Sequence, residues 1–383
     1  AMRAAAGLLL PERRIGLAAH DFQHAAAAPR VILSRALRDA DAETTPARWV
    51  NRLVNLLAGL PERAGPAALA AMRARGAELV ARTAALERPA ASLPRALRPA
   101  PRPPVAVRPR SLPVTAIRTL IRDPYAIYAR NILGLRRLDP LRAEPDARLR
   151  GSVLHSALEA FVRERPEGEG RAAARARLIA TAEAALADLV PWPASRALWA
   201  ARLEAAADFL LDLEAEAPGE AVLLEESGRI VLPGNGFVLT ARPDRIDRLA
   251  DGRLHILDYK TGDPPSKRQI ALFDKQLLLE AAMARAGGFP IGPAPVARAT
   301  YVGLGGTPKA LVVETADAAL DATLEALARL IDRYGIRAQG YAARRAVEKV
   351  TDTGDYDHLA RFGEWSQADP PAPADVGPPE GSA

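Results

Sequence analysis

The sequence predicts an α/β protein in which a smaller, mostly helical segment precedes a domain that mixes helices with strands. Alanine- and leucine-rich stretches fill residues 172–216, which is typical of long helices. Short apolar runs follow, bounded by glycine, proline or aspartate, and predict strands at 221–224, 229–232, 237–246 and 254–259. The alternation continues with a helix at 274–286, strands at 297–304 and 310–314, and a final amphipathic helix over 320–331.

Length and composition limit the kind of protein. The chain has 383 residues, which suits about two domains, and a hydrophobic fraction of 49% is enough for a sizeable core. The absence of cysteine excludes disulfides, zinc–cysteine sites and iron–sulfur clusters, so any metal must be held by oxygen or imidazole ligands. A formal net charge of +6 and a pI of about 9.8 favour an anionic partner such as nucleic acid, although free use of arginine in a GC-rich genome explains the charge equally well.

A short apolar run near the N-terminus superficially resembles a signal peptide. The run spans Ala4–Leu10, is followed at once by a charged Pro-Glu-Arg-Arg sequence, and has no cleavage-like site behind it. No apolar stretch approaches the ~18 residues that a membrane span requires. We therefore expect a cytoplasmic protein with no membrane partner.

We expect four regions along the chain. Residues 1–87 are predicted to be mostly helical, because apolar residues recur at helical spacing over Trp49–Leu57. Residues 88–110 contain seven prolines, six arginines and no acidic residue, which predicts an extended basic linker. This linker either straps two domains together, which we favour, or lies along DNA phosphates. The second domain spans 111–366, and a tail over 367–383, rich in proline, alanine and glycine, is predicted to be disordered.

The strongest chemical signal is a hairpin that carries two aspartates and a lysine. Asp251-Gly252 stands between two apolar-alternating runs, which is typical of a tight turn. Folding about this turn brings Asp244 roughly opposite Asp258. Side chains alternate along a strand, so Asp258 and Lys260 share one face. An ordinary surface hairpin with a Lys–Asp ion pair would explain those two residues alone, but Asp244, fourteen residues upstream of Asp258, favours a functional site.

Two converging carboxylates repel each other unless a cation compensates them. Mg²⁺ prefers oxygen ligands and keeps several waters, so Asp244 and Asp258 with a backbone carbonyl suit it well. A bound cation polarises a phosphodiester and lowers the pKa of bound water, while Lys260 stabilises the attacking hydroxide or the negative charge that develops at phosphorus. These residue types are therefore those that phosphodiester hydrolysis requires.

Two helices add polar residues to this hairpin. A Gly-x-x-x-His sequence opens a predicted helix at His155, and His155, Leu158 and Val162 lie near one face of it. The imidazole therefore points inward, as a metal ligand, a phosphate contact or a satisfied core histidine. Gln276 and Glu280 lie one turn apart on the helix after the hairpin. They either position DNA and support the metal or belong to a solvated face.

These motifs, in this order and spacing, resemble the RecB-type branch of the PD-(D/E)XK nucleases. The motifs are Gly-x-x-x-His at 151–155, Asp244, Asp-x-Lys-Thr-Gly at 258–262 and Gln-x-x-Leu at 276–279. Within this branch the chain is most similar to the C-terminal part of the AddB family, the second subunit of AddAB helicase–nucleases. Asp-Pro-Tyr-Ala-Ile-Tyr-Ala at 123–129 and Tyr-Asp-His-Leu-Ala-Arg at 356–361 support the similarity, and residues 1–87 resemble the end of the AddB helicase-like region.

The resemblance implies a restriction-endonuclease-like core, with a central mixed sheet flanked by helices. It implies Mg²⁺-dependent cleavage of one DNA strand during double-strand break processing for recombination, with Mn²⁺ able to substitute. It assigns catalytic roles to His155, Asp244, Asp258, Lys260 and the supporting Gln276. It assigns metal binding to His155, Asp244, Asp258 and the carbonyl of Tyr259. The implied partners are single-stranded DNA and an AddA-type helicase–nuclease subunit, which would supply ATP hydrolysis.

Two features depart from the AddB pattern, and a third observation concerns ATP. Many AddB proteins hold an iron–sulfur cluster through four cysteines, whereas this chain has none and carries Asp123 where the first is expected, so packing must clamp the fold instead. Glu280 stands where relatives often carry tyrosine, which leaves its role open. No Gly-x-x-x-x-Gly-Lys-Ser/Thr motif occurs, and the glycines of 303–306 form a turn between strands. The chain thus holds no ATP motor and would be a fragment of a longer subunit.

Two other functions are compatible with these residues. A non-catalytic scaffold that binds DNA and a helicase partner would suit the basic linker, but such domains usually lose an acidic residue or the lysine, and all are present here. An RNA nuclease would share the active-site chemistry.

Overall fold

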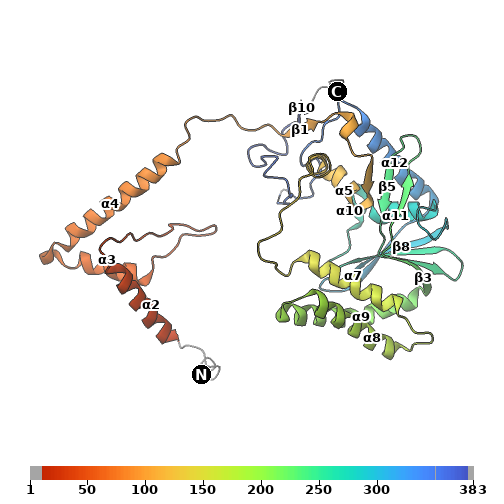
Figure 1. Ribbon diagram of the computed structural model, residues 1–383, viewed down its shortest axis with the longest axis horizontal. Coiled ribbons are helices and arrows are strands. Elements are labelled where there is room, and N and C mark those ends of the chain that lie inside the picture. Colours follow the sequence, from red (N-terminus) through yellow and green to blue (C-terminus); the bar gives the residue numbers. More distant parts are fainter. Residues whose placement is uncertain (1–10, 350, 378–383) are drawn as a thin grey trace. The chain divides into compact units, whose positions relative to one another are not determined.

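The computed structural model describes residues 11–349 and 351–377, and its contacts divide the chain into two units, Ala1–Pro94 and Arg95–Ala383 (Figure 1). The division falls inside the proline-rich linker that the sequence predicts. The apolar run Ala4–Leu10 lies outside the described residues. Within the described part of the chain, no helix is both long and apolar enough to cross a membrane.

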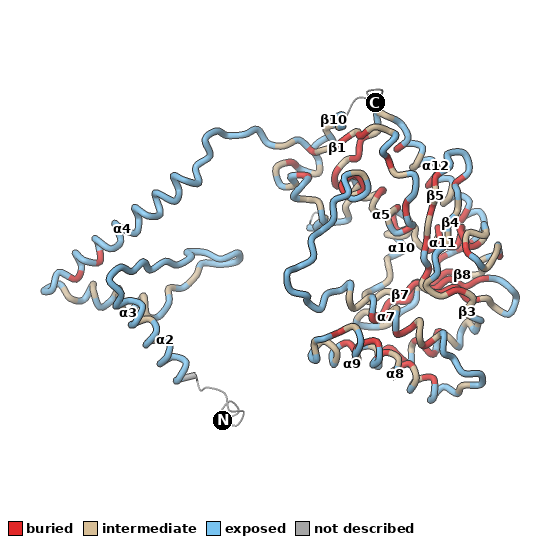
Figure 2. The backbone as a smooth tube through the Cα atoms, in the orientation of Figure 1, coloured by how far each residue is buried: buried red, intermediate tan, exposed pale blue. Residues whose placement is uncertain are grey.

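The first unit is helical, as predicted. Its elements are α2 (Pro11–Ala26), α3 (Arg48–Ala58), the 3₁₀ turn η1 (Pro61–Arg63) and α4 (Gly65–Leu86). Helix α3 packs against α4 at a tight corner, where a Cβ on Gly65 would lie 2.1 Å from the carbonyl oxygen of Leu57. Only Gly65 and Leu69 are buried among the described residues of this unit, and Figure 2 shows it almost entirely exposed. The unit therefore has hardly any core of its own.

The second unit begins with a proline-rich strand that the tail covers. Strand β1 (Pro99–Arg102) pairs in parallel with β10 (Ala372–Asp375). The proline carbonyls of β1 also accept hydrogen bonds, because Tyr341 donates to Pro101 over 2.9 Å and Ala343 donates to Pro99 over 3.0 Å. Here the structure departs from the expected extended linker and disordered tail. Proline removes donors but leaves every carbonyl available, so a proline-rich segment still pairs along one edge.

A five-stranded mixed sheet forms the centre of the second unit. Its strands lie in the order β3 (Gly219–Leu224), β6 (Arg245–Leu249), β7 (Leu254–Lys260), β8 (Val296–Gly303) and β9 (Lys309–Val313). Only β7 and β8 are parallel, and the other neighbours are antiparallel. The predicted Asp-Gly turn joins β6 to β7, with Gly252 at a φ of 81° that favours glycine.

The predicted strand over 237–246 is wrong in one respect, because it is two strands in two sheets. Strand β5 (Val238–Ala241) joins a separate three-stranded sheet with β2 (Ser111–Pro113) and β4 (Gly228–Val231). The chain then passes Pro243 and enters β6. Proline cannot donate a ladder hydrogen bond, so it ends the pairing of β5 and lets the chain change sheets.

Helices cover both faces of the central sheet, which confirms the predicted architecture (Figure 1). Leu257, Tyr259 and Val302 face one core, which they share with α7 (Ala147–Arg163), α8 (Arg171–Leu189) and α9 (Pro193–Glu216). Ile246 and Ile256 face the other core, which they share with α5 (Val114–Arg122), α11 (Gln276–Arg285) and α12 (Asp317–Gly335). Alternation along β7 thus sends neighbouring residues into different helical layers. Short elements complete the unit: η2 (Val105–Val107), α6 (Pro124–Ile127), the π-helix η3 (Tyr128–Ile132) and α10 (Lys267–Leu272).

Candidate active site

The β6–β7 hairpin places the predicted acidic residues side by side. The register pairs Arg245 with Leu257, and extending it by one residue sets Asp244 against Asp258. Asp244 lies just outside β6, where its Oδ2 accepts the backbone N–H of Tyr259 over 2.6 Å. This bond fixes the Asp244 carboxylate against the end of β7.

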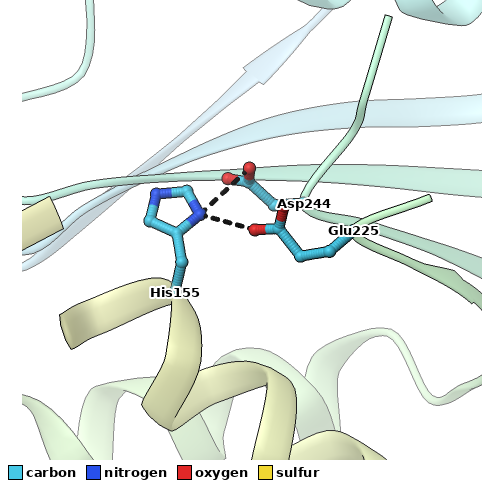
Figure 3. A group of neighbouring side chains, drawn as sticks. All are labelled: His155, Glu225 and Asp244. Atoms are coloured by element: carbon cyan, nitrogen blue, oxygen red, sulfur yellow. Dashed lines mark hydrogen bonds and ion pairs between the residues drawn. The ribbon is translucent and has the colours of Figure 1, made fainter. Parts of the chain in front are cut away.

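His155 of α7 points at Asp244 and at a third acidic residue, Glu225 (Figure 3). Its Nδ1 lies 3.1 Å from Oδ1 of Asp244 and 2.9 Å from Oε1 of Glu225. One ligand atom from each residue lies within 4.8 Å of the others, the only such group of metal-ligating side chains found in the described part of the chain. Burial alone would lower the pKa of His155, but the hydrogen bonds and charges of Asp244 and Glu225 raise it to about 10.

Glu225 is the residue of this site that the sequence analysis missed. It follows β3 with a φ of 50°, a left-handed conformation that is unusual for a glutamate. The N–H of Glu225 donates to the carbonyl of Asp244 over 3.2 Å, and the Arg242 side chain donates to the carbonyl of Glu225 over 2.5 Å. A carboxylate directly after an apolar strand was the available signal, and it differs from the Asp-Gly hairpin that singled out Asp258.

A second polar cluster lies at the end of β7 and the start of α11. Lys260 Nζ lies 2.7 Å from Oδ2 of Asp258 and 3.3 Å from Oε1 of Gln276. Gln276 Nε2 donates to Asp258 over 2.7 Å and to Glu280 over 3.1 Å. The predicted face of Gln276 and Glu280 is therefore turned toward the hairpin and is not solvated.

Burial dominates the electrostatics of this second cluster. Asp258 and Glu280 are both 1% exposed. Burial and the charge of Asp244 raise the pKa of Asp258 to about 7, against the opposing charge of Lys260. Burial and then the charge of Asp258 hold the pKa of Glu280 well above its usual range. Burial alone would lower the pKa of Lys260, but Asp258 raises it, so the ammonium stays charged.

The donor set at the end of β7 fits a divalent cation. His155, Glu225 and Asp244 offer imidazole and carboxylate ligands, which hard and borderline divalent metals accept. The N–H and carbonyl of a strand residue point to the same side, so the Tyr259 carbonyl faces Asp244 as its N–H does. Asp258 Oδ2 is buried without a hydrogen-bond partner in the described structure, although it pairs with Lys260 by charge. The Lys260 ammonium lies 2.7 Å from this oxygen and compensates its charge, so the fit to a cation rests on His155, Glu225 and Asp244.

A mixed sheet between two helical layers, with acidic residues and a lysine at the end of a central strand, defines an α/β domain of nuclease type. Residues 111–350 match the model of the PD-(D/E)XK nuclease superfamily. The match covers more than half of the chain and includes both polar clusters. The chain therefore belongs to the PD-(D/E)XK nuclease superfamily, as its motifs predicted.

Curated relatives of the chain include proteins from Rickettsia. An uncharacterised protein from Rickettsia felis is 31% identical over 181 residues, which cover 45% of this chain and 21% of the relative. An uncharacterised protein from Rickettsia conorii is 31% identical over 179 residues, with the same coverage. The chain thus spans about a fifth of the length of these relatives.

Two solved structures align with the chain at low similarity. The crystal structure of SSO0001 shares 11% identity at a TM-score of 0.27, over 58% of this chain and 76% of that chain. A candidate exonuclease from Eubacterium rectale shares 10% identity at a TM-score of 0.35, over 67% of this chain and 94% of that chain. Both TM-scores are too low to support a conclusion about this chain.

Proposed function

We propose that the chain is a Mg²⁺-dependent deoxyribonuclease that hydrolyses phosphodiester bonds of single-stranded DNA as an exonuclease, with Mn²⁺ as a substitute metal. The observation that supports this is the meeting of two polar clusters at one end of β7. One holds His155 with two carboxylates, and the other holds Asp258 and Lys260. A divalent cation in the first cluster would supply Lewis-acid polarisation of the phosphodiester and a water of lowered pKa.

The first cluster is organised by hydrogen bonds from one imidazole and one backbone amide. His155 Nδ1 draws Asp244 and Glu225 together, while the Tyr259 amide holds the second oxygen of Asp244. The two carboxylates are thereby kept close enough to share one cation. If a ring nitrogen of His155 were also a ligand of that cation, the imidazole would have to be neutral. Glu225 joins the proposed metal ligands Asp244, Asp258, His155 and the Tyr259 carbonyl.

Lys260 is placed to stabilise charge on a bound phosphate. Its ammonium is anchored by Asp258 and Gln276, and its side chain is 37% exposed, so it has access to a substrate at the open end of the strand. A fixed cation aimed at developing negative charge lowers the barrier because it needs no reorganisation during the reaction. Gln276 supports both groups by donating to Asp258 and accepting from Lys260.

The direct test is cleavage of labelled single-stranded DNA by the whole chain with Mg²⁺, with Mn²⁺ and with EDTA. We expect cleavage in both metals, none in EDTA, and none by Lys260→Ala. Lys309→Ala is the matched control, because Lys309 lies on the same sheet and pairs with an aspartate over 3.0 Å but is 52% exposed and outside both clusters. If the wild type binds DNA but cleaves none, either alone or after a helicase partner is added, the non-catalytic scaffold is favoured instead.

We further propose that the chain works as the AddB-type part of an AddAB helicase–nuclease in double-strand break repair. The AddB-like motifs at 123–129 and 356–361 support this. The full-length subunit should co-purify with an AddA-type subunit. A complex that carries Lys260→Ala should unwind DNA but leave one of the two strands uncut. Normal cutting of both strands would contradict the assignment.

A further inference from the structure

A basic groove of about 580 Å³ lies between α5–α6–η3 and the residues 344–347 and 352–356. Five arginines and a tyrosine contribute to its walls: Arg118, Arg122, Arg130, Arg136, Arg344 and Tyr356. Arg130 and Arg136 are exposed, and neither has a carboxylate partner in the described part of the chain. The π-helix η3 carries Arg130, and this rare backbone form is found frequently at functional sites.

The acidic residues of the groove are already engaged. Asp123 accepts the backbone N–H of Arg344 over 2.9 Å, and Asp352 pairs with Arg122 over 2.9 Å. Asp355 lies 3.8 Å from Arg137. The charges of Arg130 and Arg136 are therefore not cancelled within the groove, and its open surface is cationic.

A short chain of contacts joins this groove to the active site. Arg118 of the groove wall pairs with Asp274 over 3.2 Å, and Asp274 also accepts the hydroxyl of Tyr301 over 2.8 Å. Asp274 stands two residues before Gln276, whose amide bonds Asp258. One end of the basic wall is thus fixed to the loop that positions the second polar cluster.

We propose that this groove holds a single strand of DNA next to the active site, with Arg130 and Arg136 on backbone phosphates and the ring of Tyr356 against a base. The inference rests on the proposed nuclease function and names the path of its substrate. A cationic groove with an aromatic side chain is the combination that binds single strands without sequence preference. Its volume is in the range of small-ligand sites, ~300–1,000 Å³, which suits one or two nucleotides and not a duplex. Tyr356 is held for this role because its hydroxyl donates to the carbonyl of Leu135 over 2.9 Å.

The salt dependence of binding tests the two phosphate contacts. Affinity for a labelled oligothymidylate of about 20 nucleotides, longer than a typical single-strand binding site, would be measured by fluorescence anisotropy in EDTA at several salt concentrations. Each lost phosphate contact on a single strand reduces the slope of log K against log salt by about 0.7, so Arg130→Ala/Arg136→Ala should reduce it by about 1.4. Tyr356→Leu should weaken binding by about 10-fold and leave the slope unchanged, because it removes stacking and no charge.

Arg329→Ala/Arg333→Ala is the matched control, since it removes two exposed arginines from α12 and should leave the slope at the wild-type value. Melting temperatures establish that each variant is folded. If the double variant unfolds, Arg130→Gln alone replaces it, and the slope of log K against log salt should then fall by about 0.7. Equal slopes for the groove and control variants would overturn the proposal. Because binding is measured without metal, this result is separate from the cleavage test. A chain that binds through the groove but never cuts would refute only the nuclease function.

Discussion

Glu214 of α9 should contribute more to stability than an exposed glutamate of the same helix, because it pairs with a buried charge of the central sheet. Arg245 of β6 has a side chain that is 2% exposed, and its guanidinium lies 3.1 Å from Glu214 of α9, 2.6 Å from Asp247 and 3.5 Å from the hydroxyl of Tyr259. Burial alone would lower the pKa of Arg245, but its partners raise it above the usual range, so the charge stays in place. This network braces the hairpin from the face opposite α11.

The expected cost of Glu214→Gln follows from these contacts. Removing one partner of a buried ion pair costs about 3–5 kcal/mol, because the remaining charge is left without water. Asp247 still compensates Arg245 in the variant, and glutamine keeps an oxygen that accepts a hydrogen bond. We therefore expect a loss of about 2 kcal/mol of unfolding free energy and a fall of about 4–8 °C in the melting temperature.

Urea unfolding followed by tryptophan fluorescence measures this loss, since Trp199 is buried in the same helix. Glu204→Gln is the matched control on α9, because Glu204 is 56% exposed and lies 3.7 Å from Arg175. Surface pairs of this kind contribute about 0–1 kcal/mol, so the control should unfold near the wild-type midpoint. If both variants unfold at the same urea concentration, the buried network does not brace the hairpin.

Three further predictions concern single residues of the second unit. Glu225→Gln should lower metal-dependent cleavage by about 10-fold or more and raise the Mg²⁺ concentration for half-activity, whereas its exposed neighbour variant Glu226→Gln should match the wild type in the same Mg²⁺ titration. Glu280 has a raised pKa in the fold, so it stabilises the folded state below pH 4.5 and loses this contribution as the pH rises. Urea titrations in EDTA at pH 5 and pH 8 should show that the wild type loses more unfolding free energy between these pH values than Glu280→Gln does. Equal losses in the two proteins would contradict a buried acid. Burial and the charge of Arg298 lower the pKa of His255 to about 3, so this histidine stays neutral in the fold. The unfolding free energy should therefore fall as the pH drops below 6.5, by about 2 kcal/mol between pH 7 and pH 5. This loss should be absent from His255→Gln.

The hairpin of the site was predictable because its determinants are local. An Asp-Gly turn fixes the register, and period-two alternation then decides that Asp258 and Lys260 share a face. The placement of Asp244 follows from the same register. His155 required only the assumption that an apolar helix face turns toward the sheet, and α7 packs in that way.

Glu225 was not predictable on the same terms. It directly follows β3, and its distance from His155 depends on how β3 pairs with β6 and on how α7 crosses the sheet. Its left-handed φ of 50° also has no local signal, because glutamate rarely adopts that conformation. Such a conformation persists only where surrounding structure holds it, and here Asp244 and Arg242 bond its backbone.

The predictions for the two ends of the second unit rested on amino-acid composition. Composition indicates a flexible segment only if no other part of the chain pairs with that segment. The segment of β1 was predicted to be an extended linker and that of β10 a disordered tail, yet each supplies the other with backbone partners. Arg98 adds charge-assisted hydrogen bonds from beneath, to the carbonyls of Ala343 and Gln367 over 2.9 and 3.0 Å. Pairing between segments so far apart in the chain leaves no local pattern to detect.

The same long-range pairing explains how a chain without cysteine closes its C-terminal segment onto α5 and α6. The side chain of Arg344 is 2% exposed and donates to the carbonyl of Asp352 over 2.7 Å and to Asp357 over 2.8 Å, while its guanidinium lies 4.0 Å from the ring centre of Phe362. Asp123 accepts the backbone N–H of Arg344 across 221 residues of sequence. Burial raises the pKa of Asp123, and that N–H bond opposes the rise. Packing alone, as the sequence suggested, would not orient this segment. Directional hydrogen bonds around the buried Arg344 orient this segment. Asp123, which stands where a cysteine ligand of the iron–sulfur cluster was expected, is one of the acceptors of these bonds.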